Sequence, residues 1–338
     1  MNFKALLAGG FLLSSVSIMA HDGVEHSHSS TVTAPITSPV QTGQGDLKYT
    51  TVPGWGKIPG KDYIGSTHGG IVVDKTGKVY VSTDGDNNLV VYAEDGKFIK
   101  SFGPETKKIH GMNIAEDEGV EYIYAAAMGK VHKISLDGKI VTSIDGSKQE
   151  GHNWKRATAV AVAPNGDIFI ADGYGSSVIF KYDKTGKFIK KIGVKGKKDG
   201  EFTTSHGLAV DSRNPEKPML VVADRENRRI QLLDLDGNFI KIATTDLRRP
   251  CSLSIWGDYV AVAELEGRVV ILDKDYKVVS KIGDNPDKKL WAKFPAAPEV
   301  WQGGIFTAPH GISFDHKGNL YVMDWNKWGR VTKLTKDK

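Results

Sequence analysis

The feature that most constrains the fold of this chain is an internal repeat, which starts near residues 68, 110, 158, 206, 251 and 310. Successive starts are 42, 48, 48, 45 and 59 residues apart, and each unit holds four short β-rich runs separated by turn glycines. Four-stranded units that recur about every 40 to 50 residues are typical of the blades of a β-propeller. The sequence therefore predicts an all-β fold, a six-bladed β-propeller.

Hydrophobic patterning within the repeats favours strands over helices. Residues 78–81 and 167–170 are short runs of β-branched and aromatic side chains next to glycine. Glycine accounts for 38 of the 338 residues, which fits a chain with many tight turns. The sixth repeat ends at Lys338 without room for its last strand. We therefore expect residues 47–58 to supply an N-terminal strand that closes the ring and removes the open sheet edges.

The first 20 residues have the pattern of a secretory signal peptide. Lys4 precedes an apolar stretch, and the segment ends at the small residue Ala20. The stretch is short and interrupted by glycine, and no second apolar run follows, so we expect no membrane span. These features predict a secreted or periplasmic protein.

Residues 21–45 are rich in His, Ser, Thr, Pro and Gln, a composition that cannot bury enough apolar surface to fold. We expect this segment to be a flexible leader, followed by a propeller domain over residues 46–338. The leader begins with three histidines and two carboxylates within eight residues. A second interpretation therefore stays open, in which the leader captures a transition metal.

Overall charge argues against a nucleic-acid partner. The net charge is only +5, and basic and acidic residues are interleaved along most of the chain. Predicted export further weakens the idea of an RNA-binding propeller face. The single cysteine, Cys251, excludes an intramolecular disulfide, so stability must come from packing.

The start of each repeat carries the residues with the most distinctive chemistry. In a propeller the innermost strands line the central channel, so equivalent positions on them converge near the axis. The six repeats carry at this position His68, His110, Thr158, His206, Cys251 and His310. Imidazole binds zinc, copper, iron and nickel, and three protein ligands leave a position open for water or substrate. The set predicts a metal site, although any one histidine in this position could instead be a packing residue.

Two levels of family resemblance follow from particular segments. Residues 309–324 resemble the NHL repeat, which also implies a six-bladed propeller and says little about function. Residues 171–174 and 222–231 resemble the lyase domain of the peptidylglycine α-amidating enzymes, and the similarity runs through most of residues 68–338.

This second resemblance implies a carbon–nitrogen lyase with a catalytic zinc on His110, His206 and His310. It also implies that Tyr174 is the catalytic tyrosine and that Arg225 is an active-site arginine. The implied reaction cleaves a C-terminal α-hydroxyglycine, on a peptide or a small molecule, into an amide and glyoxylate.

The chemistry of these residue types suits such roles. A tyrosine with a pKa of about 10 acts as a base only where a nearby cation stabilises its phenolate. Arg225 offers a fork of donors that matches a carboxylate. Simpler interpretations stay open: Arg225 could pair with Glu226 or Asp224, and Tyr174 could be a turn aromatic.

The chain departs from the family pattern at several positions. Residues 82–86 lack the family's first-blade arginine, and Gly311 stands where the family has an aspartate that helps to hold a structural calcium. Carboxylate binding and calcium are therefore both open questions. His68 and Cys251 are not part of the pattern and are possible additional metal ligands; Cys251 is either a packing residue or a thiol that faces the metal.

A competing hypothesis is that the protein is not an enzyme. An NHL propeller can use one face to bind a protein or carbohydrate partner, here in the cell envelope. That hypothesis predicts a function that survives the loss of Tyr174.

Overall fold

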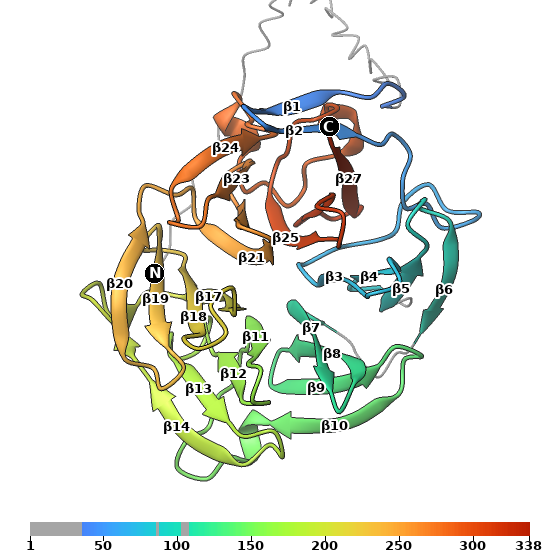
Figure 1. The fold of residues 1–338 in the computed structure, drawn as a ribbon. Helices are drawn as coiled ribbons and strands as arrows, with labels where there is room; N and C mark the ends of the chain where they lie inside the picture. Colours follow the sequence, from blue (N-terminus) through green and yellow to red (C-terminus); the bar gives the residue numbers. More distant parts are fainter. Residues whose placement is uncertain (1–35, 86–87, 103–107) are drawn as a thin grey trace, which may run out of the picture. The chain divides into compact units, whose positions relative to one another are not determined.

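The computed structural model describes residues 36–85, 88–102 and 108–338. Its strands form six antiparallel blades, five with four strands and one with five. The blades are arranged in a ring, as Figure 1 shows. Blade 1 contains β3 (Ile71–Val73), β4 (Val79–Ser82), β5 (Leu89–Tyr92) and β6 (Phe98–Phe102). Blade 2 contains β7 (Gly111–Asp117), β8 (Val120–Ala127), β9 (Lys130–Ser135) and β10 (Ile140–Asp145). Blade 3 contains β11 (Ala159–Val162), β12 (Ile168–Ala171), β13 (Ile179–Tyr182) and β14 (Phe188–Ile192).

The second half of the chain continues the same pattern. Blade 4 contains β17 (Ser205–Asp211), β18 (Met219–Asp224), β19 (Arg229–Asp234) and β20 (Phe239–Thr244). Blade 5 contains β21 (Pro250–Trp256), β22 (Tyr259–Glu264), β23 (Arg268–Leu272) and β24 (Val278–Ile282). Blade 6 contains β25 (Pro309–Phe314), β26 (Leu320–Asp324) and β27 (Arg330–Lys336). A two-residue parallel ladder, β15 (Val194–Lys195) with β16 (Glu201–Phe202), precedes blade 4. The predicted six-bladed, all-β architecture is confirmed.

The ring is closed by an N-terminal strand, as the sequence predicts. Strand β2 (Leu47–Thr51) pairs antiparallel with β27, with Tyr49 opposite Lys336 and Thr51 opposite Leu334. Strand β1 (Gln41–Gln44) then forms a hairpin with β2 and adds a fifth strand to this sheet. The end of the segment that we expected to be a flexible leader is therefore a strand, because the outer edge of β2 offers unpaired backbone groups.

The hydrophobic core is divided between neighbouring blades. Each of six clusters of buried side chains straddles two adjacent sheets, because both faces of a blade are covered by its neighbours. In one cluster Ile170 and Phe180 of blade 3 pack with Val131 and Ile144 of blade 2. This packing explains why second strands such as β12 and β26 are buried along their whole length instead of alternating between buried and exposed residues.

Outer hairpins are set by an aspartate and a glycine. In the turn between β13 and β14, Oδ1 of Asp183 accepts hydrogen bonds from the backbone N–H groups of Thr185 and Lys187. Gly186 has a φ of +84°, which a side chain would strain. The turn glycines of the repeat therefore have a conformational reason.

The first strands of the six blades line the centre of the ring. Each packs against the first strand of the next blade, and β25 packs against β3 to complete the circle. The space that they leave is a cavity of about 30 Å³. A volume of that size is enough for a water molecule.

Helices play a small part in the described residues, where three single 3₁₀ turns occur at Gly146–Lys148, Lys288–Leu290 and Pro298–Val300. None of the helices in these residues is long and apolar enough to cross a membrane. The predicted signal peptide and most of the predicted leader lie outside the described residues.

Candidate metal and catalytic site

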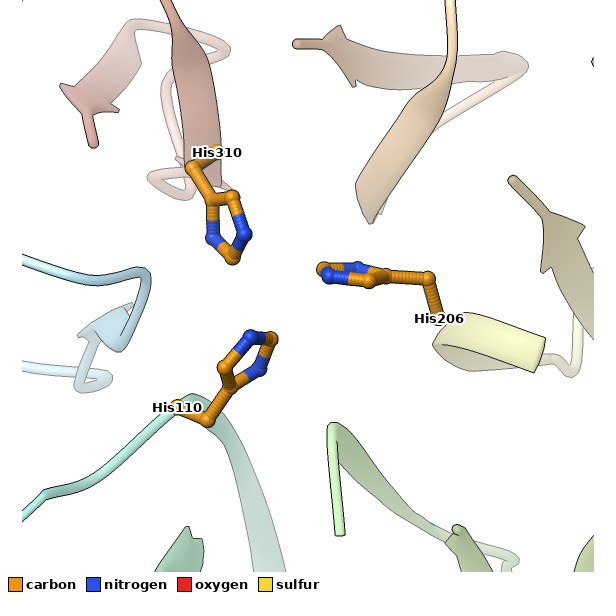
Figure 2. A group of neighbouring side chains, drawn as sticks. All are labelled: His110, His206 and His310. Carbon is orange, nitrogen blue, oxygen red and sulfur yellow. The ribbon is translucent and has the colours of Figure 1, made fainter. Parts of the chain in front are cut away.

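Three histidines from alternate blades meet at one end of the inner strands. His110 directly precedes β7, His206 is the second residue of β17, and His310 is the second residue of β25. Their rings point toward one another in Figure 2, and all three pairs of ring centroids are 4.8 Å apart. One ligand nitrogen from each histidine lies within 4.8 Å of the others, and all three side chains are buried. The structure therefore brings together the three histidines that the resemblance implied.

Backbone carbonyls of the intervening blades orient two of the rings. Nδ1 of His110 lies 2.8 Å from the carbonyl oxygen of Thr158, and Nδ1 of His206 lies 2.9 Å from that of Cys251. A carbonyl only accepts, so each Nδ1 carries the proton and each Nε2 keeps its lone pair. Nδ1 of His310 is buried and has no hydrogen-bond partner among the described residues.

Burial keeps these imidazoles neutral. It lowers the pKa of His110 to about 3, assisted by the neighbouring positive charge of His68 when that ring is protonated. Burial also lowers the pKa of His206 and of His310 well below the usual value, with Arg225 and the other histidines acting in the same direction. Neutral imidazole is the form that binds a metal.

A glycine follows each of the three histidines because the next blade approaches closely. A Cβ atom at Gly207 would lie 2.3 Å from the carbonyl oxygen of Cys251, and one at Gly111 would lie 2.5 Å from that of Thr158. At Gly311 a Cβ atom would lie 2.3 Å from the carbonyl oxygen of Gly69. A side chain at Gly311 would therefore clash with the backbone of blade 1.

Tyr174 lies directly against the histidine cluster. It is carried by the turn after β12, where the Oδ2 atom of Asp172 accepts hydrogen bonds from the N–H and hydroxyl groups of Ser176. The phenol oxygen is 3.2 Å from Nε2 of His110 and 3.1 Å from Nε2 of His206. The same nitrogens that could hold a metal are thus in contact with the phenol.

Arg225, next to β18, donates a hydrogen bond from Nη1 to the phenol oxygen of Tyr174 at 2.9 Å. Burial raises the pKa of Tyr174, and the Arg225 guanidinium opposes that rise. Arg156 adds a second guanidinium, whose Cζ lies 5.2 Å from the centre of the same ring. The alternative interpretation of Arg225, a pair with Glu226, describes an observed contact, because Nε of Arg225 also donates to Glu226 at 2.9 Å.

A carboxylate that the sequence analysis did not place in the site joins two arginines. Glu226 accepts from Arg225 and also from Nη2 of Arg249, at 2.7 Å. Asp224, the other partner considered for Arg225, binds Arg229 instead, at 2.8 Å. Arg249 is two residues before Cys251, so the repeat register could have identified it as a residue near the channel.

His68 and Cys251 lie beside the three-histidine group without belonging to it. The His68 ring is 5.0 Å from the His110 ring, and its Nδ1 lies 3.4 Å from Oδ2 of Asp84. The Cys251 thiol is buried with Leu265 and contacts the carbonyl oxygen of Arg249 at 3.5 Å. Burial raises the pKa of this thiol to about 11, so it stays protonated at neutral pH in this environment.

Comparisons with known proteins agree with this fold. A family model described as "6-bladed beta-propeller" matches residues 156–260. The solved structure of a streptogramin B lyase aligns with a TM-score of 0.56 at 15% sequence identity, over 82% of this chain and 96% of that one. At that identity the likeness concerns the fold alone.

Similar sequences are named as amidating lyases. A probable peptidyl-alpha-hydroxyglycine alpha-amidating lyase of Caenorhabditis elegans is 32% identical over 154 residues, 43% of this chain and 43% of that protein. Peptidyl-alpha-hydroxyglycine alpha-amidating lyase 1 of Drosophila melanogaster is 33% identical over 144 residues, 38% of this chain and 26% of that protein. The matches span less than half the length of either relative. The chain is thus an NHL-like six-bladed β-propeller that resembles the peptidyl-α-hydroxyglycine α-amidating lyases.

Proposed function

We propose that the protein is a zinc-dependent carbon–nitrogen lyase that cleaves an α-hydroxyglycine-type substrate into an amide and glyoxylate. The observation that carries the proposal is the contact of one phenol oxygen, that of Tyr174, with two histidine Nε2 atoms and with Arg225. Similarity to proteins named as amidating lyases supports the choice of reaction.

The donor set fits zinc. His110, His206 and His310 offer three neutral nitrogen ligands, and a three-histidine zinc site keeps one position open. Two of the rings are held by hydrogen bonds to carbonyl groups at Nδ1, which is typical of metal-binding histidines. When bound, zinc would act as a Lewis acid toward a substrate oxygen and would favour a nearby phenolate. We propose no calcium site, because the potential metal ligands that group together in the described residues are histidines and not carboxylates.

Tyr174 is then the general base. Its phenolate removes the proton from the substrate hydroxyl, the carbon–oxygen bond becomes a carbonyl, and the carbon–nitrogen bond breaks. The leaving amide nitrogen takes up a proton, so a hydroxyglycine compound yields an amide and glyoxylate with no other reactant. Arg225 assists by stabilising the phenolate against the effect of burial.

The test is to load the purified protein with zinc, add α-hydroxyhippurate and measure glyoxylate and benzamide. We expect both products in equal amounts, and no release after the metal is chelated. Tyr174→Phe should lower kcat by about 10²- to 10⁴-fold while the bound zinc is retained. Tyr122→Phe is the matched control, since Tyr122 lies in β8 and contacts Lys133, outside the histidine site.

If the zinc-loaded protein releases no glyoxylate, the lyase proposal fails. In that case the competing hypothesis applies, in which the propeller binds a protein or carbohydrate partner in the cell envelope.

The proposal includes a secreted or periplasmic location, on the basis of the signal-like residues 1–20. Sequencing the N-terminus of protein recovered from the cell envelope or medium tests it. We expect the mature chain to begin at His21, and a chain that keeps Met1 would contradict this location.

A further inference from the structure

Three arginines surround the phenol of Tyr174 on the side of blades 3 to 5. Arg225 and Arg249 share one carboxylate, that of Glu226, with distances of 2.9 and 2.7 Å. The Cζ atoms of Arg156 and Arg225 lie 5.2 and 5.0 Å from the centre of the Tyr174 ring. This part of the site has more guanidinium groups than side-chain carboxylates to pair with them.

Arg225 has little capacity left to bind a substrate carboxylate. Its Nε donates to Glu226 and its Nη1 donates to Tyr174. Each edge of the guanidinium therefore has one nitrogen already engaged, so neither edge offers the free pair of donors that a bidentate carboxylate needs. The side chain is also buried. Its contacts suit a residue that positions and polarises the phenol.

Arg249 is committed along one edge of its guanidinium. Its Nε and Nη2 atoms both donate to the carboxylate of Glu226, at 3.2 and 2.7 Å. That bidentate pair occupies one whole edge of the guanidinium. Binding a second carboxylate there would require Glu226 to be displaced.

Arg156 is the one of these three guanidinium groups that no side-chain carboxylate of the described residues engages. Arg156 is exposed, and no carboxylate of the described residues lies within ion-pair distance of its side chain. Its backbone N–H donates to Oδ1 of Asp172 at 2.8 Å, while Oδ2 of Asp172 holds the N–H of Ser176 at 2.7 Å. One carboxylate thus fixes both the loop that carries Arg156 and the turn that carries Tyr174.

The opposite side of the site carries a carboxylate, that of Asp84. Asp84 of blade 1 lies 3.4 Å from Nδ1 of His68 and accepts from the hydroxyl of Ser66 at 3.0 Å. Negative charge on blade 1 and free positive charge at the loop before blade 3 would orient an anionic substrate.

We propose that Arg156 binds the carboxylate of the substrate and so selects α-hydroxy acids over their neutral amides. This inference rests on the proposed lyase function, which defines the substrate, but it can be measured by binding alone. Arg156 acts as a specificity-determining residue, and Arg225 serves the phenol.

The experiment compares two unreactive probes, hippurate and its neutral amide hippuramide, on the zinc-loaded protein by calorimetry. We expect the wild type to bind hippurate about 10- to 100-fold more tightly, the range of a charge-assisted hydrogen-bonded contact. Arg156→Gln should remove most of that preference and leave hippuramide binding unchanged. Arg156→Lys should restore part of it, because lysine keeps the charge but loses the fork.

The matched control is Lys155→Gln, which removes the same charge from the neighbouring exposed residue. It should keep the preference for hippurate. A wild type without that preference would overturn the inference, as would Arg156→Gln with the preference intact. Equal loss of both probes in Arg156→Gln would show a structural effect and would also overturn it.

Turnover of α-hydroxyhippurate separates this inference from the lyase proposal. If the wild type releases glyoxylate and Arg156→Gln has an unchanged KM, the inference fails and the lyase proposal stands. If the wild type prefers hippurate through Arg156 but releases no glyoxylate, the lyase proposal fails and the carboxylate site stands.

Discussion

The residue at the start of the inner strand has two different roles in alternate blades. In blades 2, 4 and 6 the residue at the start of the inner strand is a buried histidine, and these three side chains converge. In blades 3 and 5 the same position holds Thr158 and Cys251, which contribute backbone carbonyls to His110 and His206. The difference shows that the side chains of one set of blades are oriented by the backbone of the other set.

Blade 1 breaks this alternation. His68 occupies the position of Thr158 and Cys251, but its ring pairs with Asp84 and is partly exposed. By the same pattern, blade 1 would supply a backbone carbonyl that orients His310. Nδ1 of His310 is instead buried without a hydrogen-bond partner in the described residues. The irregularity falls where blades 6 and 1 meet, at the contact of β25 with β3.

The sharpest way to break the comparison is to change one position in each set of blades. His206→Ala should bind no stoichiometric zinc and release no detectable glyoxylate, because two imidazoles hold zinc poorly. Thr158→Ala should keep the zinc, since the carbonyl that supports His110 belongs to the backbone. This substitution removes only the hydrogen bonds of the Thr158 hydroxyl, which should lower the free energy of unfolding by about 1 kcal/mol. Metal analysis after dialysis measures the zinc content of both variants. Loss of zinc in Thr158→Ala would refute the division of roles between the two sets of blades.

A second comparison uses the residues that follow these positions. Gly207→Ala should lower the free energy of unfolding by about 1 to 3 kcal/mol, because the added Cβ meets the Cys251 carbonyl at 2.3 Å. In blade 3 the corresponding residue is Ala159, and Ala159→Gly should cost about 1 kcal/mol from strand flexibility. Urea denaturation of the metal-free proteins measures both. Equal stability of Gly207→Ala and wild type would contradict the close approach.

The pH dependence of stability sharpens the contrast further. Since burial lowers the pKa of His110 from 6.5 to about 3, the unfolded chain binds more protons between those values. The contribution of neutral, buried His110 to the free energy of unfolding is complete above pH 6.5 and is lost as the pH falls toward 3. Each such histidine contributes about 1 kcal/mol per pH unit in that range.

We therefore expect the metal-free wild type to lose stability steeply from pH 6.5 to 5. His310→Gln should show a shallower slope, because one neutral buried imidazole has been removed. Thr158→Ala should keep the wild-type slope. Urea titrations at several pH values test this, and identical slopes in His310→Gln and wild type would count against it.

The smallest effect is expected at Cys251. Cys251→Ser keeps the carbonyl that orients His206, and its hydroxyl can still donate to the carbonyl of Arg249. We expect unchanged zinc content and a loss of stability of about 1 kcal/mol for burying a more polar group. A fall in zinc content would instead make the thiol a ligand.

Much of the fold could be predicted from local signals. The repeat spacing and the β-rich runs near residues 78–81 and 167–170 depend on residues close in sequence, and the structure has strands at both places. Strand β1 was missed. Its hairpin partner β2 is close in sequence, but the contact of Gln44 with Ser280 joins residues far apart.

The sequence by itself determined the six blades, the closing strand and the set of residues at the start of each repeat. Only the tertiary structure decided which of those residues meet. Six blades in a ring bring all six equivalent positions near the axis. The side chains of His110, His206 and His310 meet at the centre, while His68 and Cys251 lie beside them. The ring also brought Glu226 to both Arg225 and Arg249 and left Arg156 unpaired among the described carboxylates. Such pairings depend on distances across the ring, which no local pattern in the chain encodes.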